Sequence, residues 1–476
     1  MDTEPLKFEN LEQEQDILIE GDEFKKTDTR KNLIICISVT VAIFIIITIT
    51  LAVTLTVGDD EPKEDKKTEP EPKPRSLLDI DKLKKYETPY YYYNTSLLNE
   101  TISEALRLSK LHNLKIHFSL KSNFNEKILR LFSSHKEIGA DCVSGGEVNY
   151  ALQFFDAKDV VFAGIGKTDK EIEFAVDKGI FCINVESYEE LENLNRICKE
   201  KQKTMNFATR INPNIEAHTH EKIVTGLNEN KFGIYMEENE TKFYDKISDV
   251  FFNKDGQYEY LNFIGLHFHI GSNILNFTDF ARLSEKIDKI IEGLNNRSIS
   301  ITYLNLGGGL GVDYNDTYNH PIPDFEGYFN TYLTNITSLQ KIGPDFNDNK
   351  NITLHFELGR SMIAQSGYVI SRVNYIKEGV KKKFAILDAG MNDLIRPAMY
   401  GALHQIERIE INDEKVMYDV VGPICESSDV FAKNYTMDKL RKGDYVLIRT
   451  AGAYGESMAS RYNFRDLIKG YLDYEF

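Results

Sequence analysis

The stretch KIHFSL, residues 115–120, is a short β-rich run that ends directly before a lysine, Lys121. Seven further runs of this kind follow, with stretches between them that have room for a helix. They are ADCVS (140–144), VVFAG (160–164), FCINV (181–185), NFATRI (206–211), FIGLHFHI (263–270), ITYLNL (301–306) and ITLHFEL (352–358). Eight strands, each followed by a helix, make up a (β/α)8 barrel, so we predict an α/β fold of this type.

Polar, charged and glycine residues stand at the ends of most of these runs. They are Lys121, Asp141, Ser144, Glu186, Arg210, His269, Gly307, Gly308, Gly309, Glu357 and Arg360. In a barrel, the carboxyl ends of the strands converge on one mouth, where catalytic groups collect. We therefore expect a functional site at this mouth.

Other segments flank the predicted barrel, which we assign to 95–365. After about residue 365, strand-like runs follow one another mostly without long helices, which predicts a C-terminal β domain over 366–476. The tyrosine-rich segment TPYYYYN, residues 88–94, lies before the barrel, and we expect 80–94 to add a strand to the β domain.

The N-terminal part contains a stretch without charged residues, from Asn32 to Val57. As a helix it is about 39 Å long, enough to cross a hydrocarbon core of about 30 Å. It predicts a single transmembrane helix between a polar tail, 1–31, and a charged, proline-rich linker, 58–79. Basic residues before it favour a cytosolic N-terminus, and nine Asn-x-Ser/Thr acceptors favour a lumenal or extracellular catalytic part.

Composition excludes some classes of function. The 476 residues carry a formal net charge of −17, which argues against nucleic-acid binding. Five scattered cysteines provide neither a disulfide framework nor the spacing of a zinc site. No other cluster completes a ligand set, so no metal site is predicted.

Lys121 and Glu357 each allow two interpretations. Lys121 is either a lysine whose lowered pKa allows its neutral amine to form a Schiff base, or a surface lysine that extends its charge to water. Glu357 and Arg360, in HFELGRS, are either a structural ion pair or a ligand pair. As ligands, the carboxylate would face a pyridine nitrogen and the guanidinium would grip a phosphate or carboxylate.

Three further motifs are also ambiguous. LNLGGGLG, residues 304–311, is either a phosphate-binding turn or a tight barrel turn, and it lacks the lysine of a P-loop. In GLHFHIGS, His269 could stack on a flat ring and Ser272 could donate to phosphate, while His267 is expected to point to the other face of the strand and pack. Cys425 beside Glu426 is either a general acid or a buried β-domain thiol.

Taken together, the segments between about 85 and 465 resemble the fold-type III pyridoxal-phosphate decarboxylases, and within them the diaminopimelate decarboxylases. The motifs that carry the resemblance are FSLKSN, GADCVSGGE, FAGIGKTDKEI, INVESYEEL, RINPNIEAHTH, TGLNENKFGI, GLHFHIGS, GGGLG, ELGRS, RPAMYGA, VVGPICESSDVFA and AGAYGESMASRYN. The sequence departs from the pattern at Leu358, where the family usually has proline, and at Ser119 and Ser122 beside the lysine.

The resemblance implies a role for each matching residue. Lys121 would bind pyridoxal 5′-phosphate covalently and Cys425 would be the proton donor. The other cofactor contacts would be Asp141, His269, Ser272, Gly307, Gly308, Gly309, Glu357, Gly359, Arg360 and Tyr454. The substrate contacts would be Arg360, Arg396, Tyr400, Glu426 and Tyr454. The family also implies a homodimer in which the Cys-Glu pair reaches the partner's site.

The activity that the resemblance implies is decarboxylation of meso-2,6-diaminopimelate to L-lysine. Two alternatives remain at this point. One is a related decarboxylase acting on ornithine- or arginine-type amino acids, whose substrates offer no distal carboxylate to Arg396. The other is a catalytically inactive, membrane-tethered homologue, against which the presence of Lys121, Glu357 and Cys425 speaks.

Overall fold

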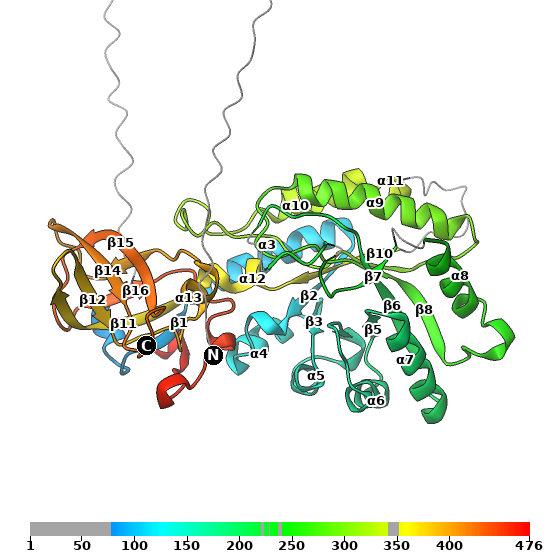
Figure 1. Ribbon diagram of the computed structural model, residues 1–476, viewed down its shortest axis with the longest axis horizontal. Helices are drawn as coiled ribbons and strands as arrows, with labels where there is room; N and C mark the ends of the chain where they lie inside the picture. The colour runs from blue at the N-terminus through cyan, green and yellow to red at the C-terminus, as the bar shows by residue number, and fades with distance from the viewer. Residues whose placement is uncertain (1–77, 220–222, 228, 237–239, 341–351) are drawn as a thin grey trace, which may run out of the picture. The chain divides into compact units, whose positions relative to one another are not determined.

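The computed structural model describes residues 78–476, apart from 220–222, 228, 237–239 and 341–351. The described part forms two sheets, one in a barrel and one in a β domain that follows it in the chain (Figure 1).

Eight parallel strands close the barrel, as predicted, since β5, the first strand in the sheet order, also pairs with β6, the eighth. The strands are β2 (Leu114–Ser119), β3 (Ile138–Cys142), β4 (Val160–Phe162), β5 (Cys182–Val185), β6 (Met205–Asn212), β8 (Leu261–His267), β9 (Tyr303–Asn305) and β10 (Thr353–Leu358). A two-residue strand, β7 (Ile234–Tyr235), pairs in parallel with the end of β6. Each predicted run overlaps one barrel strand.

Helices alternate with these strands. They are α3 (Thr95–His112), α4 (Glu126–Ser134), α5 (Gly145–Ala151), α6 (Asp169–Lys178), α7 (Tyr188–Lys201), α8 (Glu240–Phe251), α9 (Thr278–Asn295), α10 (Phe325–Asn335), α11 (Thr337–Gln340) and α12 (Arg360–Ile363). Local sequence sets their ends. At α6, the Thr168 side chain and Glu171 form a reciprocal capping box, and Gly179 ends the helix in the left-handed conformation.

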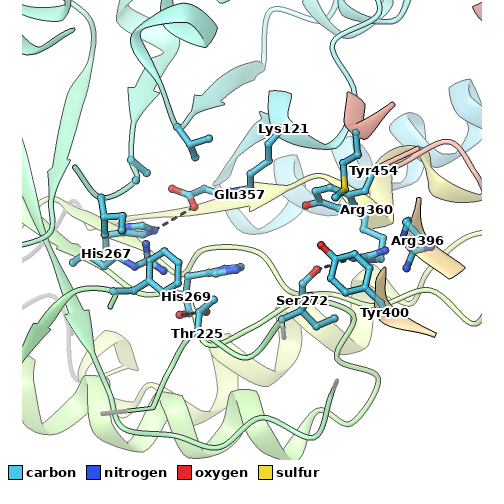
Figure 2. Close-up of a pocket in the computed structure, with 18 residues that line it drawn as sticks. Lys121, Thr225, His267, His269, Ser272, Glu357, Arg360, Arg396, Tyr400 and Tyr454 are labelled. Atoms are coloured by element: carbon cyan, nitrogen blue, oxygen red, sulfur yellow. Dashed lines mark hydrogen bonds and ion pairs between the residues drawn. The ribbon is translucent and has the colours of Figure 1, made fainter. Parts of the chain in front are cut away.

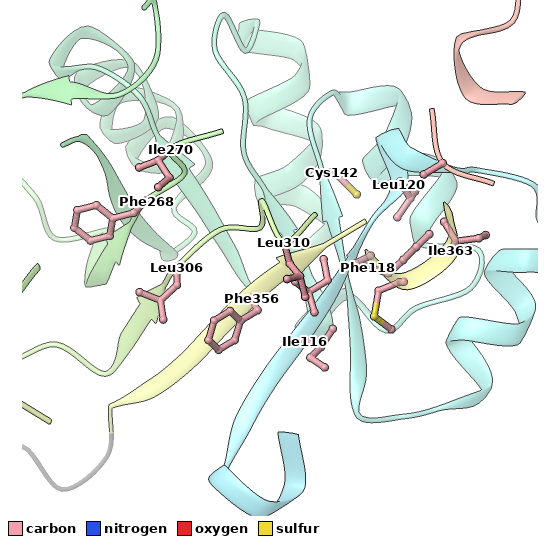
Figure 3. Packing of buried hydrophobic residues seen from close by; sticks show 14 of the residues in the cluster. Ile116, Phe118, Leu120, Cys142, Phe268, Ile270, Leu306, Leu310, Phe356 and Ile363 are labelled. Atoms are coloured by element: carbon pink, nitrogen blue, oxygen red, sulfur yellow. The ribbon is translucent and has the colours of Figure 1, made fainter. Parts of the chain in front are cut away.

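Alternation along the strands separates an apolar shell from a polar interior. Phe118 on β2 stacks on Phe132 of α4 with ring centroids 3.9 Å apart, and Phe356 on β10 packs against three aromatic rings of α10. Ile116, Phe118 and Phe356 belong to this buried cluster (Figure 3). Their neighbours on the two strands, His117 and His355, point to the opposite face of the sheet. There His117 Nε2 lies 2.8 Å from His355 Nδ1.

The β domain combines its own strands with the segment before the barrel. Its strands are β11 (Gly367–Glu378), β12 (Lys383–Leu387), β13 (Ile406–Arg408), β14 (Lys415–Val421), β15 (Val430–Asp438), β16 (Tyr445–Ile448) and β17 (Gly470–Leu472). β1 (Tyr90–Tyr93) pairs antiparallel with β11 and parallel with β17. Two short helices, α2 (Ile80–Leu83) and α13 (Arg396–Tyr400), complete the α-helices of the described part.

The predicted membrane localisation is contradicted. Among the residues that the structure describes, none of the helices combines the length and apolar character that crossing a bilayer requires. The predicted span, 32–57, and its flanking segments up to residue 77 lie outside the described residues. The prediction depended on the uncharged stretch and its flanking charges, and hydropathy alone does not establish where a catalytic domain resides.

Candidate active site

A cavity of about 470 Å³ opens at the carboxyl ends of the barrel strands, with walls from both the barrel and the β domain (Figure 2). Eight of the predicted site residues line it: Lys121, His269, Ser272, Glu357, Arg360, Arg396, Tyr400 and Tyr454. Arg210, singled out only as a strand-end residue, lines it too, and so do nine residues not predicted for the site, among them Thr225, His267 and Met458. The expectation that functional residues gather at the carboxyl ends of the barrel strands, which we call the strand-end rule, therefore located the barrel half of the cavity.

Lys121 follows β2 directly, in a short 3-10 turn, Leu120–Ser122. Its Nζ lies 3.3 Å from Oδ2 of Asp141, a fully buried carboxylate that also accepts a hydrogen bond from Ser119 Oγ at 2.8 Å. Burial opposes the ammonium charge, but the charges of Asp141 and other acidic neighbours outweigh it and raise the pKa of Lys121. The expected lowered pKa is therefore wrong for the protein without a cofactor.

Glu357 projects from β10 into the barrel interior, where its side chain is buried. Its Oε1 accepts a hydrogen bond from Asn305 Nδ2 at 2.7 Å. Its Oε2 lies 3.2 Å from His267 Nε2 (Figure 2). Burial alone would raise the pKa of Glu357, but His267, followed by Lys121, holds it well below its usual value. The site therefore keeps this carboxylate ionised.

His267 corrects a prediction. It was expected to point away from His269, but residues two apart on a strand share a face. The structure accordingly has both imidazoles in the cavity wall. Burial, with the charge of Lys121, lowers the pKa of His269 well below its usual value, so this ring is neutral. Correct use of the strand period would have found His267 from the sequence.

The glycine turn, residues 307–309, contacts residues of the cavity wall but does not itself line the cavity. Gly307, Gly308 and Gly309 are not among the cavity-lining residues of the described part. A Cβ at Gly308 would lie 2.1 Å from the Glu357 carbonyl oxygen, and Gly307 has a left-handed φ of 66°. The Gly308 N–H donates to His269 Nδ1 at 3.2 Å. In this structure the turn fixes His269 and Glu357 and does not form the cavity wall.

Arg360 reaches across the cavity from the start of α12. Its Nη1 donates to the Tyr314 hydroxyl at 2.6 Å and its Nη2 to Ser272 Oγ at 3.1 Å, while its guanidinium lies 4.7 Å from the Tyr454 ring centroid. Gly359, directly before it, lets the chain pass close to the turn that carries Lys121, since a Cβ at Gly359 would lie 2.9 Å from Ser122 Cβ. Tyr314, in a loop with no distinguishing local pattern, was not predicted.

The β domain supplies the opposite wall. Arg396 lies 3.0 Å from His404 Nε2, and its guanidinium packs 4.6 Å from the Tyr314 ring centroid. Tyr454 has a φ of 55°, uncommon for a bulky residue, and its N–H donates to the Ser122 carbonyl at 2.8 Å. This bond ties the β domain to the turn that carries Lys121.

Cys425 and Glu426 are not brought to this cavity. Both are exposed, in the loop between β14 and β15, and neither is among the cavity-lining residues of the described part. The alternative of a buried β-domain thiol is wrong for Cys425.

Several features of the cavity fit pyridoxal phosphate. Lys121 offers an amine, Glu357 an ionised carboxylate and His269 a neutral ring, and the volume lies in the range of small-molecule sites. Three buried polar atoms of cavity-lining residues, His267 Nδ1, Arg360 Nε and Arg396 Nε, have no protein partner in the described part. Buried polar groups normally have partners, so these atoms indicate a site that a polar ligand completes.

Comparison with known proteins likewise indicates a pyridoxal-phosphate enzyme. The family model described as pyridoxal-dependent decarboxylase, pyridoxal binding domain, matches residues 99–364. A diaminopimelate decarboxylase of Bacteroides thetaiotaomicron is 46% identical over 403 residues, 84% of this chain and 99% of that protein. The structure of Helicobacter pylori diaminopimelate decarboxylase complexed with L-lysine is 36% identical, with a TM-score of 0.73, and covers 83% of this chain and 94% of that one.

The chain belongs to the pyridoxal-dependent decarboxylases, the class that a barrel with this lysine and this buried carboxylate defines. Within that family it groups with the diaminopimelate decarboxylases. It is a carboxy-lyase, and its cofactor is pyridoxal 5′-phosphate.

Proposed function

We propose that this enzyme removes CO2 from meso-2,6-diaminopimelate and forms L-lysine, the last step of lysine biosynthesis, through the residues described above. The observation that carries the proposal is that Lys121 and Arg396 line the same cavity. A lysine that binds the cofactor and an arginine that binds a second carboxylate suit a substrate with an amino acid group at each end.

The barrel residues handle the reacting end of the substrate. Lys121 would hold the cofactor through Nζ, and Glu357, which the site keeps ionised, would be the group available to keep its ring nitrogen protonated. The bound cofactor supplies an electron sink for the pair left behind when CO2 departs. His269, being neutral, can cover the ring face without adding charge. Ser272 and Arg360 are the groups available to hold the phosphate and the substrate carboxylate.

The β-domain residues handle the distal end. A second cavity of about 380 Å³ shares Ile223, Arg360, Arg396 and Tyr400 with the first, so an extended substrate has space beyond the reacting centre. Burial, together with the nearby charge of Arg360, lowers the pKa of Arg396. Two close buried arginines repel each other, and a substrate that carries a carboxylate at each end relieves that repulsion, which favours diaminopimelate over ornithine or arginine.

We also propose that the site is completed by a second copy of the chain. Cys425 would deliver the proton that replaces CO2 on the α-carbon, and Glu426 would contact the distal ammonium. The exposure of both residues outside their own cavity supports this arrangement. A homodimer with a twofold axis allows each loop to enter the partner's site, because the two contacts are equivalent.

A substrate panel tests the proposal. CO2 release from diaminopimelate, ornithine, arginine and lysine is measured with the cofactor-loaded enzyme and with Arg396→Gln. We expect release from diaminopimelate alone, and a KM for it that rises about 10²-fold in the variant. Preferred turnover of ornithine or arginine would support the second candidate, and no turnover of any substrate would support an inactive homologue.

A further inference from the structure

We propose that His267 and Asn305 are positioning residues that hold Glu357 in one orientation, each by binding one of its carboxylate oxygens. The inference rests on the proposed role of Glu357 at the cofactor ring nitrogen, and it goes beyond that role by assigning what keeps the carboxylate aligned. Neither residue was predicted to contact the cofactor or the substrate.

Strand register explains why these three residues meet. His267 on β8 pairs with Asn305 on β9, and Asn305 in turn pairs with His355 on β10. Glu357 stands two residues beyond His355 and therefore shares its face of the strand. Three adjacent strands thus direct their side chains to one point in the barrel interior. All three side chains are nearly or completely buried, with Glu357 the most exposed at 5%.

Each oxygen of the Glu357 carboxylate has different hydrogen-bond partners. Asn305 Nδ2 donates to Oε1 at 2.7 Å, and Asn184 Nδ2 approaches the same oxygen at 3.4 Å. His267 Nε2 lies 3.2 Å from Oε2. An imidazole nitrogen facing a carboxylate must carry the proton, since two acceptors would repel. His267 therefore donates to Glu357 from Nε2.

The orientation of Asn305 is fixed independently. Its Oδ1 accepts a hydrogen bond from the Gly307 N–H at 2.9 Å, so its amide cannot flip without losing that contact. The same bond connects the glycine turn to the carboxylate. The turn therefore has a use that does not require it to touch the cofactor, because it fixes the amide that aligns Glu357.

Loss of either donor would leave a buried carboxylate oxygen without its main partner. Such an oxygen would either take up a proton or rotate toward another donor. A protonated or rotated carboxyl cannot keep a ring nitrogen protonated, so the electron sink would weaken. The expected defect therefore appears in turnover and in cofactor binding, with little change in the affinity for substrate.

Two amide substitutions at one position make the test. In His267→Gln the amide nitrogen can take the place of Nε2, whereas in His267→Asn the side chain is too short to reach Glu357. For each cofactor-loaded variant, kcat, KM for diaminopimelate and the dissociation constant for pyridoxal phosphate are measured. We expect His267→Asn to lose about 10²-fold in kcat and about tenfold in cofactor affinity, with His267→Gln restoring most of both.

Equal values for the wild type and both variants, or equal losses in both, would overturn the inference, because neither depends on reach to Glu357. If His267→Asn does not fold, Asn305→Ala tests the other oxygen, and an unchanged kcat there would also overturn it. Glu357→Gln separates the two proposals. Wild-type turnover in Glu357→Gln refutes the role of Glu357 itself, whereas an inactive Glu357→Gln beside a normal His267→Asn refutes only the positioning role.

Discussion

The barrel mouth and the loop between β14 and β15 both carry residues of the proposed site, but they hold them in opposite ways. Glu357 in the barrel is buried and bonded on both oxygens, and Lys121 is paired with a buried aspartate. Cys425 in the loop is exposed, and its described hydrogen bond comes from its backbone, which donates to Asn463 Oδ1 at 2.7 Å.

In the proposed dimer, this difference would separate the chemistry that one chain completes from the chemistry that needs a second chain. Buried charges must be satisfied within the fold, so the barrel groups are fixed before any ligand arrives. An exposed thiol is solvated by water, so it needs no partner within its own chain and remains free to contact a second one. Substitutions in the two regions should therefore have distinct signatures.

Replacement of the barrel lysine should have the largest effect. In Lys121→Ala we expect turnover to fall by at least about 10⁴-fold, because Lys121 is the only lysine among the cavity-lining residues of the described part. The visible absorption band of the lysine-bound cofactor should disappear. Borohydride reduction followed by peptide mapping checks this, and a label on a different lysine would refute the assignment.

The aromatic shell should matter for stability and not directly for chemistry. Phe356 is fully buried, directly before Glu357, so Phe356→Ala should lower the free energy of unfolding by about 3–5 kcal/mol. Leu403→Ala, at a side chain that is 63% exposed, is the matched control and should cost less than about 0.5 kcal/mol. Similar losses in urea unfolding of both variants would contradict the burial argument.

Replacement of the loop thiol, Cys425, should affect the chemistry and leave the stability unchanged. Cys425→Ala should reduce kcat by about 10²–10³-fold, as expected on removal of a general acid. The cofactor band and the urea midpoint should stay at wild-type values, because the side chain is exposed. Loss of the cofactor band in this variant would place the thiol within its own barrel site.

The buried imidazoles predict a smaller, pH-dependent effect. Burial, with the charge of Lys115, lowers the pKa of His117 to about 4. Unfolding exposes the ring to water, so below about pH 6.5 the unfolded state binds one more proton. The neutral, buried His117 ring therefore contributes to the free energy of unfolding. The contribution is fully present above about pH 6.5 and is lost as the pH falls to 4, by about 3 kcal/mol in all.

His117→Gln isolates this contribution. In urea titrations between pH 7 and pH 4, about one proton fewer should be taken up on unfolding than in the wild type. An unchanged pH dependence in the variant would mean that His117 is not held neutral in the folded protein.

The fold was largely predictable because barrel strands repeat one local pattern eight times. The strand-end rule likewise gathered Lys121, His269, Glu357 and Arg360, since parallel strands share a carboxyl edge. Tyr314 was missed because loop residues that meet a site only after folding leave no periodic signal. His267 was misplaced by an error in the strand period, and the predicted localisation was wrong because hydropathy does not report it.

The central claim is that the active centre combines Lys121 of one chain with Cys425 of another. Subunit complementation tests it most directly: Lys121→Ala and Cys425→Ala are purified, mixed, dissociated and reassembled, and CO2 release from diaminopimelate is measured. Each parent should be nearly inactive, and random pairing should restore about a quarter of wild-type activity through one intact site in each mixed dimer. A mixture no more active than its parents would contradict the account.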